Sequence, residues 1–266
     1  VGSHECRGKT LGIVGYGNIG MQLGVIAEGL GMKVIYFDVQ SKLPLGNAQP
    51  KATLISLLAE AHVVSLHVPQ HASTELLIGE KEIAALRQGA MVINASRGNV
   101  VDLDALAEAL KSGHVGGAAI DVFPVEPRSN NDEFVSPLRG LDQCLLTPHI
   151  GGSTEEAQEN IGVEVAEKLS HYSDNGTTIS AVNFPEVALP AYDGKHRLLH
   201  VHRNTPGIMS AINQVFSDNN VNVSGQYLQT LGEMGYVVID IEADYSKVLI
   251  KSLTAIEGTL RVRVLF

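Results

Sequence analysis

Near its start the chain reads Leu11-Gly12-Ile13-Val14-Gly15-Tyr16-Gly17-Asn18-Ile19-Gly20. A short apolar run precedes the G-x-G-x-x-G motif, and residues with helical periodicity follow it. Asp38 ends the next apolar run, about 20 residues further on, at the spacing of an acidic residue in dinucleotide-binding folds. This order predicts a strand, a tight turn and a helix that together bind a dinucleotide. The motif alone leaves open a glycine-rich turn without a ligand.

The three glycines have separate expected roles. Gly15 permits the tight turn, Gly17 lets the backbone approach a pyrophosphate, and Gly20 lets the helix pack closely on the strand. The helix N-terminus offers N–H groups and the positive end of its dipole to phosphates. We therefore expect the whole loop to contact the cofactor: Gly15, Tyr16, Gly17, Asn18, Ile19 and Gly20.

Asp38 bears on which dinucleotide is bound. A carboxylate at the end of the second strand can accept hydrogen bonds from ribose hydroxyls. The same charge repels a 2′-phosphate, so the residue favours NAD over NADP. A solvated carboxylate at a strand end is the alternative for this position.

Apolar and helical stretches alternate from residue 10 to about residue 150. Short apolar runs indicate buried strands at 11–15, 33–38, 62–67, 91–94, 117–121 and 144–147. Stretches with helical periodicity lie at 19–30, 53–59, 80–86 and 103–111, and a longer one follows at 154–172. Strands that alternate with crossover helices predict an α/β fold of the Rossmann type, a doubly wound parallel sheet.

A second pattern begins after a stretch rich in turn residues. Asp-Asn-Gly at 174–176 and two prolines predict a linker over 176–196. The following strands and helices are expected at 198–203, 207–219, 221–228, 236–242, 247–256 and 259–265. This βαββαβ order predicts a ferredoxin-like domain. The expected organisation is a nucleotide-binding domain at 1–175, a linker at 176–196 and a small domain at 197–266.

Composition excludes several classes of protein. The 266 residues carry a formal net charge of −10, which argues against nucleic acid as the main partner. No apolar run reaches the roughly 20 residues of a membrane span, and the first residues do not resemble a signal peptide. Two cysteines, Cys6 and Cys144, make no disulfide framework. We expect a cytoplasmic protein without a membrane partner.

Three ionisable residues follow strands, at the edge where open α/β sheets bind ligands. Arg97 follows one strand, Glu126 the next, and His149 the last. Hydride transfer to a 2-keto acid requires a proton donor to the carbonyl, which His149 can be, and a cation for the carboxylate, which Arg97 can supply. Glu126 can hold the imidazole and favour its charged form. Solvated surface residues are the alternative.

The motifs around these residues resemble those of the D-isomer-specific 2-hydroxy acid dehydrogenase family. The resemblance rests on Asn94-Ala95-Ser96-Arg97-Gly98, on Asp121-Val122-Phe123-Pro124-Val125-Glu126-Pro127 and on Thr147-Pro148-His149-Ile150, and it covers residues 7–173. It implies that Arg97, Glu126 and His149 are the catalytic trio. It also implies NAD contacts from the strand-end residues His67, Val68, Pro69, Thr74, Ala95, Ser96, Arg97, Asp121, His149 and Gly151, with Asp121 at the nicotinamide carboxamide.

Two further stretches resemble one branch of that family, which oxidises 3-phospho-D-glycerate to 3-phosphohydroxypyruvate at the start of L-serine synthesis. These are Gly151–Gln158 and the tail 197–266, which is similar to a serine-binding ACT domain. The resemblance implies an L-serine site at His202, Asn204 and, on the facing subunit, Asn222. It also implies a homo-oligomer, a tetramer in the family, with a hinge at 183–190 that the effector biases.

The sequence also departs from the family pattern. Members carry a further N-terminal segment before the position of Arg7, and that segment builds most of the substrate-binding domain. The opening residues, Val1 to Lys9, are more typical of the middle of a longer chain. We expect the 266 residues alone to bind NAD weakly and to turn over poorly.

Other functions remain open at this point. Another NAD-dependent D-2-hydroxy acid dehydrogenase is one alternative, although such relatives usually lack an ACT domain. A relative that binds NAD or serine without catalysis is another, and reduction of 2-oxoglutarate is a possible side activity. A zinc site at His196, His200 and His202 is not expected, because these residues have no acidic or cysteine partner nearby in sequence.

Overall fold

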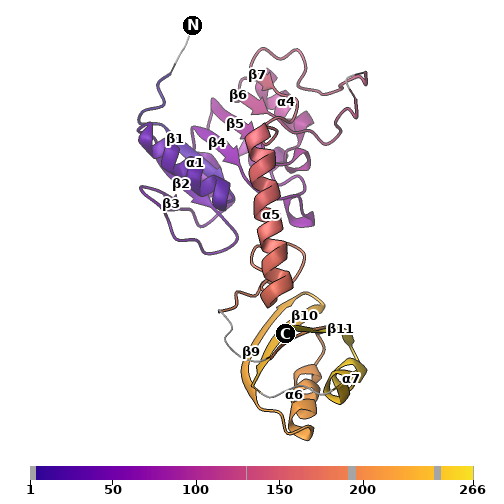
Figure 1. The fold of residues 1–266 in the computed structure, drawn as a ribbon. Coiled ribbons are helices and arrows are strands. Elements are labelled where there is room, and N and C mark those ends of the chain that lie inside the picture. The colour runs from indigo at the N-terminus through magenta and orange to yellow at the C-terminus, as the bar shows by residue number, and fades with distance from the viewer. Residues whose placement is uncertain (1–3, 130, 191–195, 243–246, 266) are drawn as a thin grey trace. The chain divides into compact units, whose positions relative to one another are not determined.

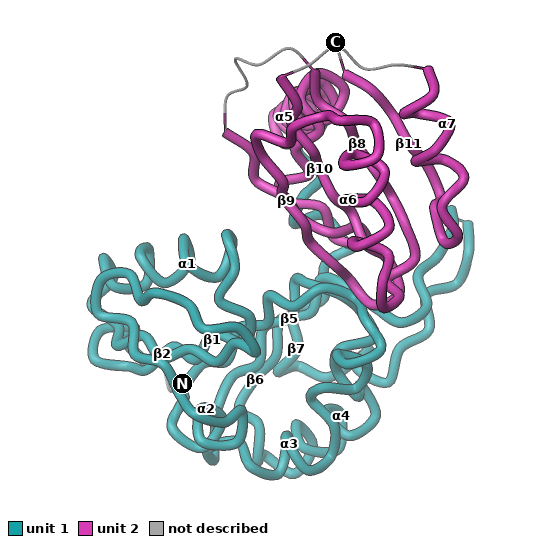
Figure 2. Tube along the Cα trace, turned by 90° about the horizontal axis from the view of Figure 1, so that it is seen from below, with its two compact units in different colours: residues 1–154 teal, residues 155–266 magenta. Residues whose placement is uncertain are grey.

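The computed structural model describes residues 4–129, 131–190, 196–242 and 247–265 (Figure 1). The chain forms two compact units, 1–154 and 155–266 (Figure 2). The long helix that follows the parallel sheet thus belongs to the second unit in this division, whereas the sequence pattern predicts the first domain boundary at residue 175. The boundaries 175 and 196 stay predictions, and residues 191–195 of the expected linker lie outside the described residues.

The first unit contains a seven-stranded sheet in the order β3-β2-β1-β4-β5-β6-β7, and its paired strands are parallel. The strands are β1 (Thr10–Val14), β2 (Lys33–Phe37), β3 (Gln49–Pro50), β4 (Val63–Leu66), β5 (Ala90–Asn94), β6 (Val115–Ile120) and β7 (Cys144–Leu146). The predicted doubly wound parallel sheet is confirmed. The order reverses between β1 and β4, so the strand ends beside that reversal form the expected ligand crevice.

Helices connect these strands as the periodicity predicts. They are α1 (Asn18–Gly29), α2 (Leu54–Glu60), α3 (Glu80–Ala84) and α4 (Leu103–Lys111), with single 3-10 turns at η1 (Ala72–Thr74) and η2 (Gly98–Val100). Side-chain caps start two of them: Thr53 accepts from the amide of Ser56, and Asp102 accepts from the amides of Asp104 and Ala105. The buried faces of α2 and α4 pack against β4, β5 and β6 in one apolar core.

The second unit begins with the long helix α5 (Glu155–Asn175) and continues into an antiparallel sheet of order β11-β8-β10-β9. Its elements are β8 (His196–Arg203), α6 (Ile208–Asp218), β9 (Val223–Leu231), β10 (Met234–Ile241), α7 (Lys247–Ala255) and β11 (Thr259–Leu265). The predicted βαββαβ plan is confirmed. No described helix is both long enough and apolar enough to span a bilayer.

The antiparallel sheet is covered on both faces. Helices α6 and α7 pack on one face around Leu198 and Val237. On the other face Leu199, Tyr236 and Val238 contact residues of the expected linker, Val187 among them. The described part of that linker is held by hydrogen bonds: the Thr178 amide donates to the Val187 carbonyl at 2.9 Å, and the Val187 amide donates to the Thr178 hydroxyl at 2.7 Å. These bonds close residues 178–187 into a loop, and Phe184 and Val187 pack this loop against the sheet.

Candidate active site

The G-x-G-x-x-G loop follows β1 and has the backbone that the motif requires. Gly15 has φ +91°, and a Cβ there would lie 2.5 Å from the carbonyl oxygen of His67. A Cβ on Gly20 would lie 2.3 Å from the Gly15 carbonyl oxygen. At Gly17, by contrast, a Cβ would meet no described atom within 4 Å. The loop is thus closed toward the sheet and open on the side where a phosphate would approach.

Helix α1 starts at Asn18 with Gly17 as its N-cap, and among the described residues no side chain caps its first turn. Backbone N–H groups at such an end suit an anion. Asn18 and Ile19 are exposed beside this end. The Tyr16 ring instead stacks on Tyr36 inside the core, so Tyr16 offers only its backbone to the loop.

Asp38 lies directly behind the glycine loop. Its Oδ2 accepts a hydrogen bond from the Tyr16 amide at 2.8 Å, and its Oδ1 accepts one from the Gln40 amide at 2.8 Å. The second strand and the loop are thereby joined through one half-buried carboxylate. Each oxygen keeps a further lone pair, so the group can still accept from a ribose hydroxyl.

The predicted adenine-side residues follow β4. The His67 amide donates to the Val14 carbonyl, and its Nε2 lies 2.9 Å from the Ser65 hydroxyl. Burial lowers the pKa of His67, so the ring is neutral at neutral pH. The Thr74 hydroxyl donates to the Pro69 carbonyl at 2.7 Å, which closes the loop after Val68.

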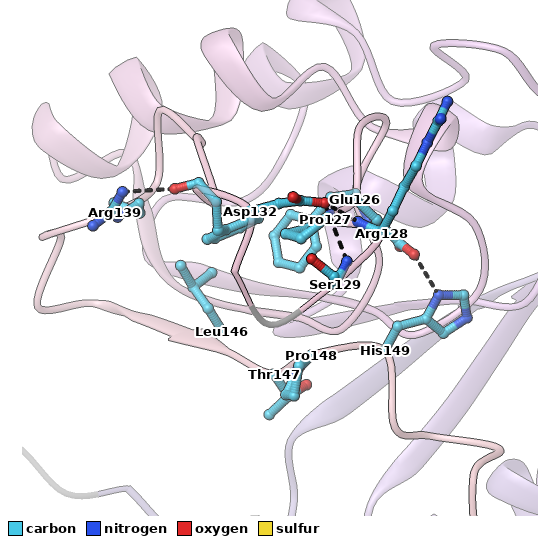
Figure 3. Close-up of a pocket in the computed structure, with 12 residues that line it drawn as sticks. Glu126, Pro127, Arg128, Ser129, Asp132, Arg139, Leu146, Thr147, Pro148 and His149 are labelled. Atoms are coloured by element: carbon cyan, nitrogen blue, oxygen red, sulfur yellow. Dashed lines mark hydrogen bonds and ion pairs between the residues drawn. The ribbon is translucent and has the colours of Figure 1, made fainter.

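The structure brings two of the three predicted catalytic residues into contact. His149 Nδ1 lies 2.9 Å from Glu126 Oε2, as the dashed line in Figure 3 marks. His149 has φ +54°, a left-handed conformation that a side-chain-bearing residue rarely adopts and that is common at functional sites. Arg97 lies at the end of β5 and donates to the Ser96 carbonyl at 2.6 Å, not to Glu126 or His149.

Glu126 is held in its charged form. Burial opposes that form, but hydrogen bonds from His149 and from the Phe123 amide outweigh it and lower the pKa of Glu126. The Phe123 bond, 3.0 Å long, folds the loop back on itself and aims the carboxylate at the imidazole. An ionised carboxylate at Nδ1 orients the ring and stabilises its positive charge, which leaves Nε2 to exchange a proton.

Asp121 organises the segment that carries His149. Its Oδ1 accepts from the Thr147 hydroxyl at 2.6 Å and from the Ile150 amide at 2.9 Å, while its Oδ2 accepts from the Gly151 amide at 2.9 Å. Burial opposes the charge, but these bonds prevail and lower the pKa of Asp121. A Cβ on Gly151 would lie 3.1 Å from Asp121 Oδ2 and 4.0 Å from the Ala95 Cβ, so the predicted nicotinamide-side residues are neighbours.

Sequence reasoning missed residues that shape this site. Asn94 is fully buried; its Oδ1 accepts from both the amide and the hydroxyl of Ser96, and its Nδ2 donates to the Arg97 carbonyl at 3.0 Å. Gly98 leaves no room for a side chain, because a Cβ would lie 2.1 Å from the Phe123 backbone. A buried-strand asparagine before Ser-Arg-Gly was the available signal, since such an amide needs partners.

A cavity of about 580 Å³ opens beside the Glu126–His149 pair (Figure 3). Its walls are largely apolar, with Phe123, Phe134 and Leu146, and two arginines lie at its edge, Arg128 and Arg139. Arg139 is engaged with the Phe134 carbonyl at 2.6 Å. The pair therefore adjoins a hollow with apolar walls, to which Arg128 and Arg139 contribute cations and Asp132 a further carboxylate.

The predicted effector residues lie in the second unit. His202 is buried on β8, and its Nδ1 lies 3.3 Å from Nδ1 of His200. Asn204 is exposed at the end of the same strand and donates to the Gly232 carbonyl at 3.2 Å. Asn222 is exposed just before β9. His202 lies near the end of β8 and Asn204 directly follows that strand, while Asn222 precedes β9, and no described bond joins Asn222 to the other two.

Comparisons with protein families divide the chain in the same way as its two sheets. Residues 1–151 match the family described as D-isomer specific 2-hydroxyacid dehydrogenase, NAD binding domain. Residues 198–261 match the AHAS small subunit-like ACT domain.

Curated relatives resemble the whole chain. The Haemophilus influenzae protein named D-3-phosphoglycerate dehydrogenase is 59% identical over 265 residues, which make up 100% of this chain and 65% of that protein. The Dictyostelium discoideum protein of the same name is 46% identical over 99% of the chain and 64% of its own length. The chain thus spans somewhat less than two thirds of the length of these relatives.

Solved structures resemble part of the chain. A glyoxylate reductase from Paecilomyes thermophila is 35% identical with a TM-score of 0.60, over 68% of this chain and 54% of that one. The NAD-complexed D-isomer specific 2-hydroxyacid dehydrogenase of Lactobacillus delbrueckii ssp. bulgaricus is 30% identical with a TM-score of 0.60, over 68% and 58%.

Proposed function

The chain belongs to the D-isomer specific 2-hydroxyacid dehydrogenase family and carries its NAD-binding domain, and from that premise we propose that it is the nucleotide-binding and regulatory part of an NAD-dependent D-3-phosphoglycerate dehydrogenase. The observation that carries the proposal is the 2.9 Å contact between His149 and Glu126 at the strand ends that follow a dinucleotide-binding loop. This proton-exchanging pair lies at the carboxyl ends of the strands, next to the position that a bound hydride acceptor would occupy.

The described residues fit NAD. The loop from Gly15 to Gly20 is open at Gly17 and would hold the pyrophosphate, and Asp38 would accept from a ribose hydroxyl. Asp121 retains one acceptor lone pair on Oδ2, which suits a carboxamide N–H. NAD, when bound, supplies the acceptor for the hydride; the protein supplies position and proton transfer.

Proton transfer, substrate binding and support of the binding residue are assigned to different residues of the chain. His149 accepts the hydroxyl proton of the substrate at Nε2, because Glu126 holds Nδ1 and stabilises the imidazolium. Arg97 binds the substrate carboxylate with its guanidinium group. To do so, the guanidinium gives up its hydrogen bond to the Ser96 carbonyl and donates to the carboxylate instead. Asn94 keeps the turn that carries Arg97 in place.

The substrate assignment rests on the relatives. Proteins 58–59% identical to this chain are named D-3-phosphoglycerate dehydrogenase, and the reaction would convert 3-phospho-D-glycerate to 3-phosphohydroxypyruvate. The net charge of −10 is no obstacle, because Arg97 and helix N-termini supply a local positive field. We place the reaction in the cytoplasm, in keeping with two free thiols, Cys6 and Cys144.

Regulation belongs to the same proposal. The ACT-like unit would bind L-serine through His202 and Asn204, with Asn222 contributed by a second copy in a homo-oligomer. An imidazole and two amides offer the hydrogen bonds that an amino acid's ends require. A serine-biosynthetic enzyme inhibited by its pathway's product would use such a site for feedback.

A substrate panel tests the proposal on the intact protein. NADH formation should require the 3-phosphate: 3-phosphoglycerate is oxidised, and D-glycerate and D-lactate react at least tenfold more slowly at equal concentration. L-serine should lower the rate with 3-phosphoglycerate. Equal rates with D-lactate would reassign the substrate, and the absence of NADH formation with every acid would remove the catalytic assignment.

A further inference from the structure

Two buried histidines lie next to each other on strand β8, on the side of the sheet that α7 covers. His200 is fully buried and His202 is 1% exposed, and their Nδ1 atoms are 3.3 Å apart. His200 Nε2 in turn lies 3.0 Å from the hydroxyl of Thr259, the first residue of β11. The Thr259 hydroxyl also lies 3.1 Å from the Leu253 carbonyl on α7. The four groups form one continuous chain of hydrogen bonds.

The proton in each of these bonds follows from counting donors. A carbonyl can only accept, so the single proton of the Thr259 hydroxyl goes to Leu253. The hydroxyl oxygen must then accept from His200 Nε2–H. A neutral imidazole carries one proton, so His200 Nδ1 is an acceptor, and the bond between the two rings requires His202 Nδ1 to be the donor.

We propose that Thr259 and His200 are positioning residues that hold His202 in its Nδ1–H tautomer, so that His202 Nε2 serves as a hydrogen-bond acceptor for the effector of the ACT-like unit. We call Thr259, His200 and His202 the histidine relay. Its direction is set at the carbonyl of Leu253, which can only accept a hydrogen bond. A histidine without the relay distributes its proton between both nitrogens and presents no fixed polarity.

Burial supports the neutral state on which the count depends. Burial and the neighbouring His202 lower the pKa of His200 to about 4. Burial also lowers the pKa of His202. Both rings are therefore neutral at neutral pH.

Glycine 235 completes the arrangement. Gly235 is the cross-strand partner of His202 on β10, and a Cβ there would lie 2.2 Å from His202 Nε2. The missing side chain gives the ring its room. Among the hydrogen bonds of the described residues none involves His202 Nε2; because the ring is 1% exposed within this unit, the proposal requires the effector to reach Nε2 at the end of the strand.

The tautomer restricts what His202 can recognise. A neutral Nε2 lone pair accepts from an ammonium or a hydroxyl and repels a carboxylate. L-serine offers both donors, so its ammonium or hydroxyl end would face His202, and its carboxylate would face amide donors such as Asn204. This consequence rests on the proposed effector role, whereas the relay itself does not.

Nitrogen NMR of the ¹⁵N-labelled chain reads the tautomers directly, without substrate or effector. We expect His202 to show a protonated Nδ1 and a pyridine-type Nε2, and His200 the opposite pattern. A pyridine-type Nδ1 on His202, or exchange-averaged shifts on both of its nitrogens, would overturn the relay.

Variants test the cause. Thr259→Val removes the hydroxyl at nearly constant shape and should convert His202 to averaged ¹⁵N shifts, while Thr259→Ser should restore the fixed tautomer. Thr254→Val is the matched control, because that hydroxyl also donates to a carbonyl of α7, at 2.8 Å from Ile250, and has no hydrogen bond to a histidine among the described residues. A His202 tautomer that survives Thr259→Val unchanged would contradict the proposal; the wild-type spectrum decides it if that variant does not fold.

Titration with L-serine separates the relay from the effector proposal. A fixed Nδ1–H tautomer together with a shift of His202 Nε2 on addition of L-serine supports both. A fixed tautomer with no response to L-serine keeps the relay and refutes the effector role of His202. A response to L-serine from a His202 of averaged tautomer keeps the effector role and refutes the relay.

Discussion

Glu126 contacts His149 from one direction and the Phe123 amide from the other, so a single carboxylate both closes its loop and orients the imidazole. The low pKa of Glu126 keeps this arrangement charged at neutral pH. Because the pKa is depressed in the folded protein, the contribution of the charge is present above the ordinary glutamate pKa. It is lost as the pH falls through the lower, folded value.

Replacing Glu126 by Gln tests this role. The amide keeps the shape but cannot stabilise an imidazolium, so we expect kcat of the intact protein to fall about 100-fold or more, in the range typical of acid–base assistance. The Kd for NAD should change little, because Glu126 is not among the expected cofactor residues. Glu133→Gln, which changes an exposed glutamate, is the control. A large rise in the NAD Kd with kcat retained would contradict the assignment.

Asp121 supports a second prediction at this scale. Both oxygens of Asp121 accept hydrogen bonds, and Asp121→Asn replaces one of them by an NH2 group, which cannot accept. In either orientation of the amide, this NH2 group then faces a donor: the Gly151 amide, or the Ile150 amide and the Thr147 hydroxyl. A buried donor left unpaired costs about 1–3 kcal/mol in the free energy of unfolding. Urea denaturation at pH 7 measures this loss in the free energy of unfolding, and Asp142→Asn, at an exposed position, is the control.

The difference between Asp121→Asn and wild type should also depend on pH. The pKa of Asp121 is lowered in the folded state, so the carboxylate stabilises the protein above its unfolded pKa. That contribution disappears as the pH falls through the folded pKa, and the two proteins should converge in stability there. A difference that stays constant down to acid pH would show that the charge is not responsible.

Among the structural elements, the glycine loop and α1 give the sharpest contrast. Gly15→Ala forces a Cβ to within 2.5 Å of a carbonyl oxygen at positive φ, whereas Gly17→Ala meets no described atom within 4 Å. We expect Gly15→Ala to destabilise the fold. We expect Gly17→Ala to leave stability within about 1 kcal/mol of wild type, the size of an ordinary glycine substitution, and to weaken NAD binding more than tenfold.

Two measurements check this pair: thermal unfolding, and titration of the chain with NAD. If Gly17→Ala bound NAD as wild type does, the loop would not be the pyrophosphate site. If Gly15→Ala were as stable as wild type, the close approach to His67 would not constrain the turn.

Most elements followed from the sequence because each is a local pattern. Apolar runs predicted six strands of the parallel sheet to within one or two residues, and the βαββαβ order predicted the second sheet. The strand β3 was missed because two residues, Gln49 and Pro50, carry no periodicity. The closure of residues 178–187 into a loop was also invisible, because the Thr178–Val187 bonds depend on a fold of the chain and not on the turn residues that suggested a linker.

In the candidate site too, the identity of the residues could be predicted from the sequence, but the contacts between them could not. Motifs identified Arg97, Glu126 and His149, but spacing alone could not say that Glu126 touches His149 while Arg97 turns to the Ser96 carbonyl. The buried ring of Tyr16 and the clamp made by Asn94 arise from packing between neighbouring strands. Contacts of that kind are set by tertiary structure, which local propensity does not encode.

For the whole molecule, each compact unit has its own core and its own buried polar anchor. In the second unit Arg197 is fully buried and donates to both oxygens of Asp240, at 2.6 and 2.8 Å, and to the Asn175 carbonyl at 3.0 Å. This fork joins β8, β10 and the end of α5. Removing one partner of a buried ion pair leaves an uncompensated charge.

Arg197→Ala should therefore destabilise the second unit by about 3–5 kcal/mol. Calorimetry of the chain should show a lower melting temperature for the transition of that unit alone, while NAD binding by the first unit is retained. Arg261→Ala, an exposed arginine on β11, is the control. A single transition that shifts as a whole would show that the two units unfold together.

We propose that this chain belongs to an enzyme that moves a hydride from 3-phospho-D-glycerate to NAD with His149 as proton acceptor. The intact protein and its His149→Ala variant are each incubated with C2-deuterated 3-phosphoglycerate and NAD, and the deuterium content of the reduced cofactor is measured. We predict deuterium transfer by the wild type and a loss of about 100-fold or more in the variant, with NAD affinity nearly unchanged. No transfer by the wild type, or equal transfer by His149→Ala, would contradict the account.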